Sequence, residues 1–198
     1  MVSRQIIALS GPRACGKSTI ASHLVNNHGY TRIAFADALR DIAAIAGPDL
    51  INDRLYLARL GEKLRAQVPD FLLQAVKNRL QEVQGHVVIE DIRFPAEIEF
   101  CKSISAPTIR FEIPIETQRE RIAKRDGKVG IEVESLIDCM DEHALGVSVD
   151  WGHVLPAIGD FSKLAAVIHT GASSSSIIWE NHHSRCDFTN SPGGRVND

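Results

Sequence analysis

The segment from Gly11 to Ser18, GPRACGKS, has the residue types and spacing of a phosphate-binding loop. It matches G-x-x-x-x-G-K-[ST] without a mismatch and lies between an apolar run, residues 6–9, and a stretch of helical periodicity. Glycines let successive backbone N–H groups point at one anion, and the following helix N-terminus adds a partial positive charge. We therefore expect a nucleoside triphosphate to bind here rather than an empty glycine-rich turn.

Two side chains of this loop carry the expected chemistry. Lys17 supplies a mobile positive charge, and the hydroxyl of Ser18 can reach a magnesium ion. The complete set expected to bind the nucleotide within the loop is Gly11, Ala14, Cys15, Gly16, Lys17, Ser18 and Thr19.

Three carboxylates follow predicted strands. Asp37 comes just after the second strand, and Glu90 and Asp91 end the third. Ligands of open parallel sheets bind outside the carboxyl ends of the strands, so we expect these side chains near the phosphate loop. A carboxylate there can hold Mg²⁺ or accept a proton from an attacking hydroxyl, with Asp91 favoured over Glu90. The alternative is that the pair caps the next turn.

Arginines near these carboxylates are candidates for binding an anionic acceptor. Arg93 follows Asp91 with one residue between them, so in an extended segment both side chains project to one side. A guanidinium binds phosphate in bidentate fashion, although a simple ion pair with Asp91 is the alternative. Arg40 and Arg65, on the two helices before the third strand, are weaker candidates for gripping an acceptor nucleotide.

Arg121 and Arg125 lie four residues apart on a predicted helix and therefore share a face. Beside a phosphate loop, such a face resembles a closing lid that neutralises charge on a transferred phosphoryl group. The alternative is a solvated, charged helix.

The elements that must position these residues alternate along the chain, which predicts an α/β fold with a parallel sheet. The fourth strand alternates in polarity, which predicts that it is less buried, and Pro69 suits the first turn of a helix. Predicted strands are residues 5–10, 30–35, 87–91, 109–113 and 151–158. Predicted helices are residues 17–27, 36–46, two within 52–84 separated at 68–70, 95–103, 116–125, 131–145 and 160–168.

The 198 residues allow one α/β domain, and the net charge of −3 argues against nucleic-acid binding through a generally basic surface. The four cysteines are too far apart to indicate a disulfide framework or a zinc site. No apolar run is long enough for a signal peptide or a membrane span, so a cytoplasmic protein is expected. The Ser-rich segment 171–198 is expected to be a flexible tail in which His182, His183 and Cys186 are not a metal site.

Five segments resemble, in order, those of the bacteriophage deoxynucleoside monophosphate kinases. They are the phosphate loop, FADALR at 35–40, LGEKLR at 60–65, EDIRFPAE at 90–97 and DEHAL at 141–145. The resemblance covers residues 5 to about 168, and its most specific element after the loop is Asp91-x-Arg93-Phe94-x-x-Glu97. It implies a three-layer, adenylate-kinase-like P-loop kinase fold with about five parallel strands. The implied domain is 1–170, with a helical acceptor-side insertion at about 50–84 and a lid-like segment at about 116–130.

The resemblance also implies ATP as donor, Mg²⁺ as cofactor and a deoxynucleotide acceptor, in the cytoplasm of a phage-infected bacterium. It assigns ATP and magnesium to Lys17 and Ser18, the metal or acceptor to Asp91, and the acceptor phosphate to Arg93. The resulting site has catalytic residues Lys17, Asp37, Asp91, Arg93 and Arg125, with Arg121 on the cofactor. Its substrate-binding residues are Asp37, Arg40, Arg65, Arg93 and Glu97, and its metal ligands are Ser18, Glu90 and Asp91.

Departures from that family leave the acceptor open. The family loop often has Asp where Ser18 stands, and Gly61-Glu62-Lys63 differs from its common Gly-Thr-Asp. Related phage kinases phosphorylate the hydroxymethyl group of 5-hydroxymethyluridine in DNA, so modified DNA is the alternative partner. A more distant alternative is an NTPase switch, which is disfavoured because no Asn-Lys-x-Asp motif is present. A homodimer is left open.

Overall fold

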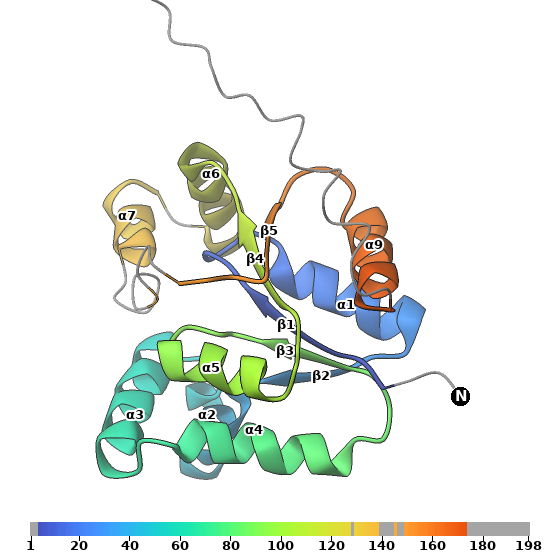
Figure 1. Ribbon diagram of the computed structural model, residues 1–198. Coiled ribbons are helices and arrows are strands. Elements are labelled where there is room, and N and C mark those ends of the chain that lie inside the picture. Colours follow the sequence, from blue (N-terminus) through green and yellow to red (C-terminus); the bar gives the residue numbers. More distant parts are fainter. Residues whose placement is uncertain (1–3, 128, 139–144, 146–148, 174–198) are drawn as a thin grey trace, which may run out of the picture.

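Five parallel strands form one sheet in the order β2-β3-β1-β4-β5 (Figure 1). The computed structural model describes residues 4–127, 129–138, 145 and 149–173. The strands are β1 (Ile6–Ser10), β2 (Thr31–Ala34), β3 (Val87–Glu90), β4 (Thr108–Glu112) and β5 (His153–Pro156). All four neighbouring pairs are parallel, which confirms the predicted α/β fold.

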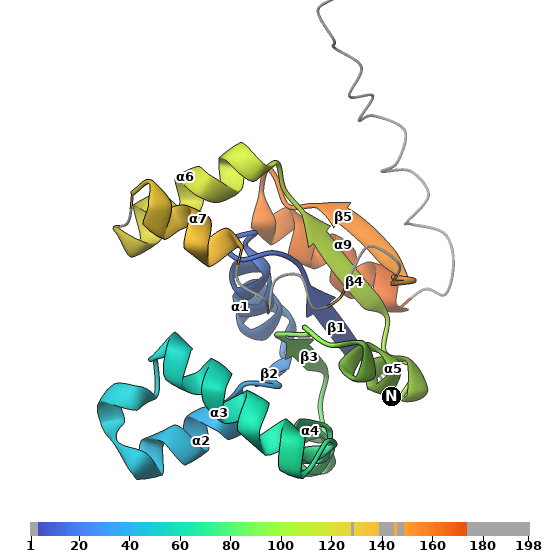
Figure 2. The same cartoon turned by 90° about the vertical axis from the view of Figure 1, so that its left-hand side faces the viewer.

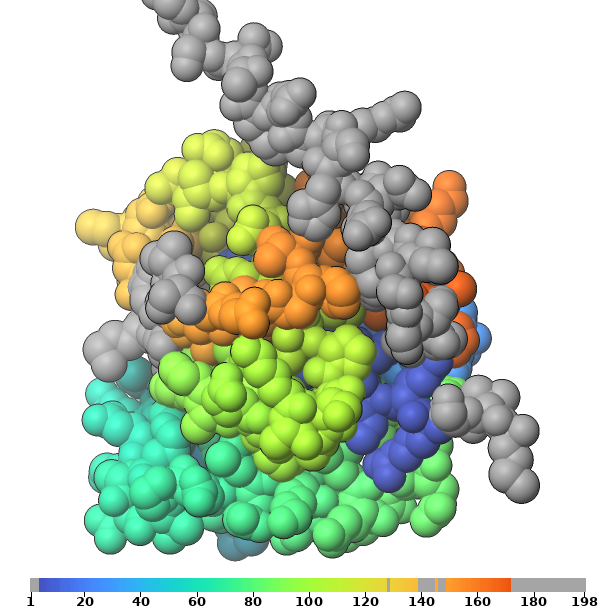
Figure 3. Space-filling model, in the orientation of Figure 1, coloured from blue at the N-terminus to red at the C-terminus, as the bar shows by residue number. Residues whose placement is uncertain are grey.

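Helices cover both faces of the sheet (Figures 1 and 2). They are α1 (Lys17–His28), α2 (Asp37–Ala46), the 3₁₀ turn η1 (Pro48–Leu50), α3 (Arg54–Gln67), α4 (Phe71–Glu82), α5 (Pro95–Ser103), α6 (Ile115–Asp126), α7 (Ile131–Ile137) and α9 (Phe161–Ser173). In Figure 3, α4 and α5 (green) cover the lower part of one face, and the residues around β5 (orange) lie above them.

The sheet separates two cores because successive side chains of a strand point to opposite faces. On one face, Ile7 and Leu9 of β1 pack with residues of α1 and α9. On the other face, Ala8 packs with Val87 and Ile89 of β3 and with residues of α2, α3, α4 and α5. A smaller cluster joins α6 to α7 outside the sheet.

The fourth strand is less buried than β1 and β3, as its alternating polarity predicts. Ile109 and Phe111 are only 1% and 0% exposed, because β5 pairs along the outer edge of β4 and the core lies beneath them. Arg110, between them, is partly exposed, and Glu112 after them is exposed. The charged positions of this strand are thus its exposed ones.

Several element boundaries differ from the prediction. Pro69 lies before α4 rather than in its first turn, because α4 begins at Phe71 after the N-cap Asp70. Of the predicted helix 131–145, the structure shows α7 from Ile131 to Ile137. The last helix, α9, continues beyond the predicted end at Ile168 to Ser173. Residues 139–144 and the tail 174–198, with His182, His183 and Cys186, lie outside the described residues. Within the described part of the chain, no helix is long and apolar enough to span a bilayer.

The strand order places the phosphate loop where the chain changes direction across the sheet. The connection from β1 leads past β3 to β2 at one edge, whereas the connection from β3 leads past β1 to β4 on the other side. This crevice at the carboxyl end of β1 is the usual ligand position in open α/β sheets.

Candidate active site

The phosphate loop adopts a backbone that only its glycines permit at two positions. Gly11 has φ 145° and Gly16 has φ 101°, both in the region that side chains disfavour. A Cβ on Gly11 would lie 2.7 Å from the carbonyl oxygen of Phe111, and one on Gly16 would lie 2.6 Å from Cζ of Phe161. The motif's glycines are thus explained by contacts with β4 and α9. At the first turn of α1, Lys17 is partly exposed, and Ser18 and Thr19 are exposed.

Arg121 of α6 binds backbone carbonyl groups of the phosphate loop. Its Nη1 donates hydrogen bonds to the carbonyl oxygens of Cys15 at 3.0 Å and Ala14 at 3.4 Å, and its Nη2 donates to Ala157 at 3.2 Å. The guanidinium carbon also lies 5.6 Å from the ring centroid of Phe161. Arg121 therefore holds the outer side of the loop, and its guanidinium is already engaged by three carbonyl groups.

Arg125 lies apart from Arg121 in its contacts, although both are on α6. Its Nε and Nη2 donate to the two carboxylate oxygens of Asp126 at 2.7 and 2.8 Å. Arg121 thus holds the phosphate loop, whereas Arg125 pairs with the next residue of its own helix. That the two form a closing lid stays a prediction.

One pocket brings together residues from β1 and β4 and from the segments that follow β1 and β3. Lys17, Asp91 and Arg93 line it as the sequence predicts, together with Ser10 and Gly11 of the loop region. Arg110 of β4 also lines it and was not predicted. Its signal in the sequence was a lone charge between two apolar residues of a strand. A lysine, two arginines and a carboxylate in one pocket suit a transfer between anionic groups.

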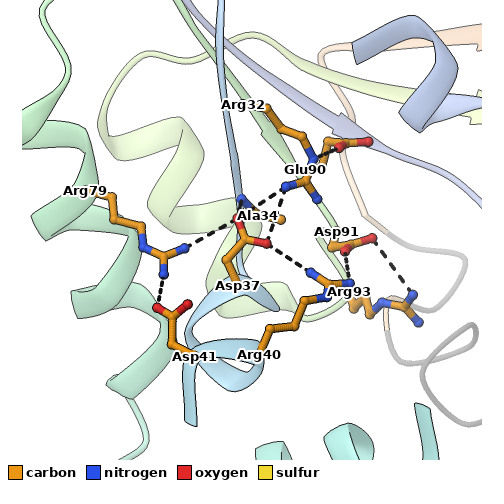
Figure 4. A network of polar contacts seen from close by, with 9 residues as sticks. All are labelled: Arg32, Ala34, Asp37, Arg40, Asp41, Arg79, Glu90, Asp91 and Arg93. Atoms are coloured by element: carbon orange, nitrogen blue, oxygen red, sulfur yellow. Dashed lines mark hydrogen bonds and ion pairs between the residues drawn. The ribbon is translucent and has the colours of Figure 1, made fainter. Parts of the chain in front are cut away.

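Asp91 is held in an unusual backbone conformation at the end of β3. Its φ is 61°, a region that non-glycine residues occupy at a cost of about 1–3 kcal/mol. The next carbonyl, of Ile92, accepts a hydrogen bond from the Ser10 hydroxyl at 3.0 Å, which ties this segment to the end of β1. The Asp91 carboxylate is 3.9 Å from Arg40 and 4.0 Å from Arg93 (Figure 4). With this backbone conformation, the side chain of Asp91 lines the pocket.

Asp37 is surrounded by donors (Figure 4). Its carboxylate lies 2.9 Å from Arg40, 3.3 Å from Arg32 and 3.4 Å from Arg79, and it accepts the backbone N–H of Ala34 at 2.8 Å. The carboxylate of Asp37 is thus engaged by three arginines and one backbone amide. Arg32 and Arg79 were missed by sequence analysis, because they come from β2 and α4 without a shared motif.

Glu90 does not line the phosphate-loop pocket. Its side chain is 1% exposed, and one carboxylate oxygen is paired with Arg32 of the neighbouring strand. Its other oxygen, Oε1, has no hydrogen-bond partner among the residues that the structure describes. Burial lowers the pKa of Arg32, whereas the charges of Glu90 and Asp37 raise it. The raising effects together are the larger, so the net shift of this pKa is upward. The expected metal ligand is thus a buried partner of Arg32, because β3 still runs regularly at residue 90 and turns only at Asp91.

Glu97 shapes the turn that carries Arg93 instead of lining the pocket. It is 4% exposed and accepts the backbone N–H groups of Arg93 at 2.7 Å and Phe94 at 3.2 Å. Burial raises the pKa of Glu97 to about 7, against the opposing effects of these hydrogen bonds and of Arg65 and Arg93. Arg65 stacks its guanidinium 4.1 Å from the centroid of the Phe94 ring. Both predicted substrate residues therefore support the segment that carries Arg93.

The donors around the pocket fit a magnesium ion that keeps most of its waters. Mg²⁺ in such sites is held by one or two protein oxygens and by substrate phosphates. Ser18 offers a hydroxyl beside Lys17, and Asp91 offers a carboxylate in the pocket. Within the described ranges, no group of three or more His, Cys, Asp or Glu side chains forms a complete protein cage for a metal.

Comparisons with known proteins support the fold. A cytidylate kinase of Pyrobaculum aerophilum is 28% identical over 123 residues, 62% of this chain and 61% of that protein. The chain thus spans less than two thirds of that relative's length. Shikimate kinase from Acinetobacter baumannii, solved with shikimate, has a TM-score of 0.55 at 17% identity and covers 85% of this chain and 93% of that one. TT1252 from Thermus thermophilus has a TM-score of 0.55 at 21% identity and covers 84% and 97%. These likenesses show a P-loop kinase fold. Residues 10–135 match the AAA domain family, to which the chain therefore belongs.

Proposed function

We propose that this protein is an ATP-dependent kinase that transfers the γ-phosphoryl group of ATP to a deoxynucleoside monophosphate. The observation that carries the proposal is the pocket that Lys17 of the phosphate loop lines together with Asp91, Arg93 and Arg110. The loop supplies the donor half of a two-substrate site. The arginines opposite it suit an acceptor that is itself anionic.

In the proposed reaction an ionised oxygen of the acceptor phosphate attacks the γ-phosphorus. The bond from that phosphorus to the bridging oxygen breaks, and the oxygen leaves with ADP. Lys17 and the loop N–H groups hold the donor phosphates, while Arg93 and Arg110 stabilise charge between the two substrates. Mg²⁺, when bound through Ser18 and Asp91, would neutralise part of the phosphate charge.

An acceptor phosphate needs no general base, and this agrees with the surroundings of Asp37. Three arginines and a backbone amide already occupy its carboxylate. The printed name of the Pyrobaculum relative, cytidylate kinase, supports a nucleotide acceptor as well. Deoxynucleotides follow from the resemblance to the phage kinases.

A hydroxyl acceptor, such as 5-hydroxymethyluridine in DNA, is the second candidate. It would need a carboxylate to take the hydroxyl proton. Asp91 is the residue that favours it, because its nearest arginines are 3.9 and 4.0 Å away and its carboxylate lies in the pocket.

Transfer of label from γ-³²P-ATP decides between these acceptors. The panel contains the four deoxynucleoside monophosphates, CMP, unmodified DNA and DNA with hydroxymethyluridine. We expect label in one or more deoxynucleoside monophosphates, and a loss of at least about 100-fold for Lys17→Ala, as when one preorganised electrostatic contact is removed. Label only in hydroxymethylated DNA would establish the second candidate. ATP hydrolysis with no labelled acceptor would refute the kinase proposal.

A further inference from the structure

An aromatic side chain lies beside one arginine of the phosphate-loop pocket. Arg110 of β4 lines that pocket, and its guanidinium carbon lies 5.6 Å from the ring centroid of Trp151, which stands shortly before β5. A guanidinium is attracted to the face of an indole ring within about 6 Å of its centroid. Both side chains are partly exposed, so the contact is only partly shielded from water.

A buried threonine of the same strand fixes the backbone next to Trp151. Thr108 lies two residues before Arg110, so the two side chains project to the same face of β4. The Oγ1 of Thr108 accepts the backbone N–H of Gly152 at 3.0 Å. A Cβ on Gly152 would lie 3.2 Å from the carbonyl oxygen of Thr108, which is too close to fit without a shift of one of them. Trp151 also packs against the core on this face, so its ring is held where Arg110 projects.

A carboxylate at the end of β4 also pairs with Arg110. Oε1 of Glu112 lies 3.7 Å from Nε of Arg110, and the side chain of Glu112 is 62% exposed. Such an exposed ion pair is screened by water and holds a long side chain only weakly. The ring of Trp151 therefore supports the guanidinium from a packed position, whereas Glu112 pairs with it in solvent.

We propose that Trp151 is a positioning residue for Arg110, and that its ring holds the guanidinium beside Lys17 and Arg93 before a substrate phosphate arrives. Fixing a long side chain in advance reduces the entropy that binding must otherwise remove. Unlike a carboxylate, an aromatic ring accepts no bidentate hydrogen bond that a phosphate would have to displace. That the phosphate belongs to a nucleotide rests on the proposed function, whereas the support of Arg110 by the ring does not.

Calorimetric titration of the full-length chain with inorganic pyrophosphate tests this role without turnover or an acceptor. Arg110→Gln is expected to weaken binding about tenfold, as the loss of a hydrogen bond between charged groups does. Trp151→Leu is expected to weaken it about threefold, as the loss of a cation–π contact at a partly exposed site does. Trp151→Phe keeps a ring and should weaken it less. In the Arg110→Gln background, Trp151→Leu should have no further effect, because the ring then has no guanidinium to hold.

Two control variants separate this role from a loss of packing and from a loss of charge. Phe100→Leu removes a ring that packs against the same core as Trp151 and contacts Phe35, and it should leave the affinity for pyrophosphate unchanged. Glu112→Gln removes the carboxylate beside Arg110, and it should change the affinity less than Trp151→Leu does. Urea unfolding of each variant checks that the titrated protein is folded.

An equal loss of affinity from Trp151→Leu with and without Arg110 would make the ring purely structural and overturn the proposal, even if the protein is a kinase. Unchanged binding by Arg110→Gln or Trp151→Leu, or a larger effect of Glu112→Gln, would also overturn it. Conversely, the expected coupling without any labelled acceptor would uphold the role of Trp151 and refute the proposed function. The same variants titrated with ATP and with a deoxynucleoside monophosphate identify the nucleotide whose phosphate Arg110 binds, because only its affinity shows the coupling.

Discussion

Gly16 of the phosphate loop lies against the aromatic ring of Phe161, the first residue of α9. A Cβ at position 16 would be 2.6 Å from Cζ and 2.8 Å from Cε2 of that ring. The same ring faces the guanidinium of Arg121, which holds the loop carbonyls from α6. The last described helix is thus part of the support of the phosphate loop, although it is far from it in sequence.

Gly16→Ala should destabilise the protein because strain and overpacking act together. The φ of 101° and the clash with the Phe161 ring each cost about 1–3 kcal/mol, so we expect a loss of about 2–4 kcal/mol in the free energy of unfolding. Urea unfolding measures this loss. Gly29→Ala is the control, since φ there is 68° and no atom of the described residues lies within 4 Å of the added Cβ. Equal losses for the two variants would show that the ring contact does not matter.

Local motifs made part of the site predictable. The phosphate loop is contiguous, and Asp91 and Arg93 follow a strand next to it, so the rule for strand ends was enough to bring them together. The parallel sheet followed from the alternation of apolar strands and amphipathic helices. These predictions depend on residues close in sequence and on one general rule of topology.

The remaining parts of the site depend on contacts between distant elements. Arg79 of α4 reaches Asp37 and Asp41, and no periodicity predicts which face of one helix meets another. Which of Glu90 and Asp91 lines the pocket also depends on the turn after β3. Side chains of a regular strand alternate between the two faces, and the φ of 61° at Asp91 breaks this alternation. Arg110 was missed because a polar position in a strand was taken as solvent exposure.

Asp37→Asn tests whether this residue organises arginines or takes a proton. Asn keeps an acceptor for Ala34 but loses its charge toward Arg32, Arg40 and Arg79. We expect KM for the acceptor to rise about tenfold, the worth of a hydrogen bond between charged groups, with little change in kcat. Initial-rate kinetics across pH measures both. Asp41→Asn, which affects Arg79 alone, should have a smaller effect. Loss of kcat together with a pH-dependent limb in its rate profile would instead identify Asp37 as a base.

Three histidines meet at the opposite end of the sheet from the site. The rings of His28 and His169 stack with centroids 4.4 Å apart, and His86 lies 6.0 Å from His169. The hydroxyl of Tyr30 is 3.2 Å from Nδ1 of His169. Burial lowers the pKa of His169 below 6.5, and the charges of His28 and His86 lower it further. The fold therefore favours the neutral imidazole.

This cluster should make stability fall in mild acid. Because the pKa of His169 is lower in the folded state, its contribution is complete above pH 6.5 and is lost as pH falls and the unfolded state binds the proton first. His169→Phe keeps a stacking ring that does not titrate. The difference in the free energy of unfolding by which the native protein exceeds this variant should therefore decrease from pH 7.5 to pH 5. His23→Gln, on α1 outside the cluster, serves as control. Urea unfolding at several pH values measures this difference. If it is the same at pH 7.5 and at pH 5, the expectation is contradicted.

The titration of Glu97 should make the free energy of unfolding fall as pH rises, whereas that of His169 makes it fall as pH drops. Burial raises the pKa of Glu97 from 4.5 to about 7, so its contribution is complete below pH 4.5 and is lost as pH rises through 7. Glu97→Gln removes this titration while an amide oxygen can still accept the N–H of Arg93 or Phe94. The variant should therefore gain on the native protein by up to about 3 kcal/mol in the free energy of unfolding between pH 4.5 and 8.

The ionised form of Glu97 is what holds the turn of Arg93 at higher pH, since a carboxylate accepts both backbone N–H groups more strongly than a protonated carboxyl does. Glu97→Gln should accordingly raise KM for the acceptor more at pH 8 than at pH 6, whereas a purely structural loss would be the same at both. Glu99→Gln, exposed on the same helix and paired with Lys102, is the matched control for both measurements. If the difference in free energy of unfolding between Glu97→Gln and the native protein stays constant with pH, the carboxyl does not titrate near neutrality, and Arg93 is positioned by the backbone turn alone.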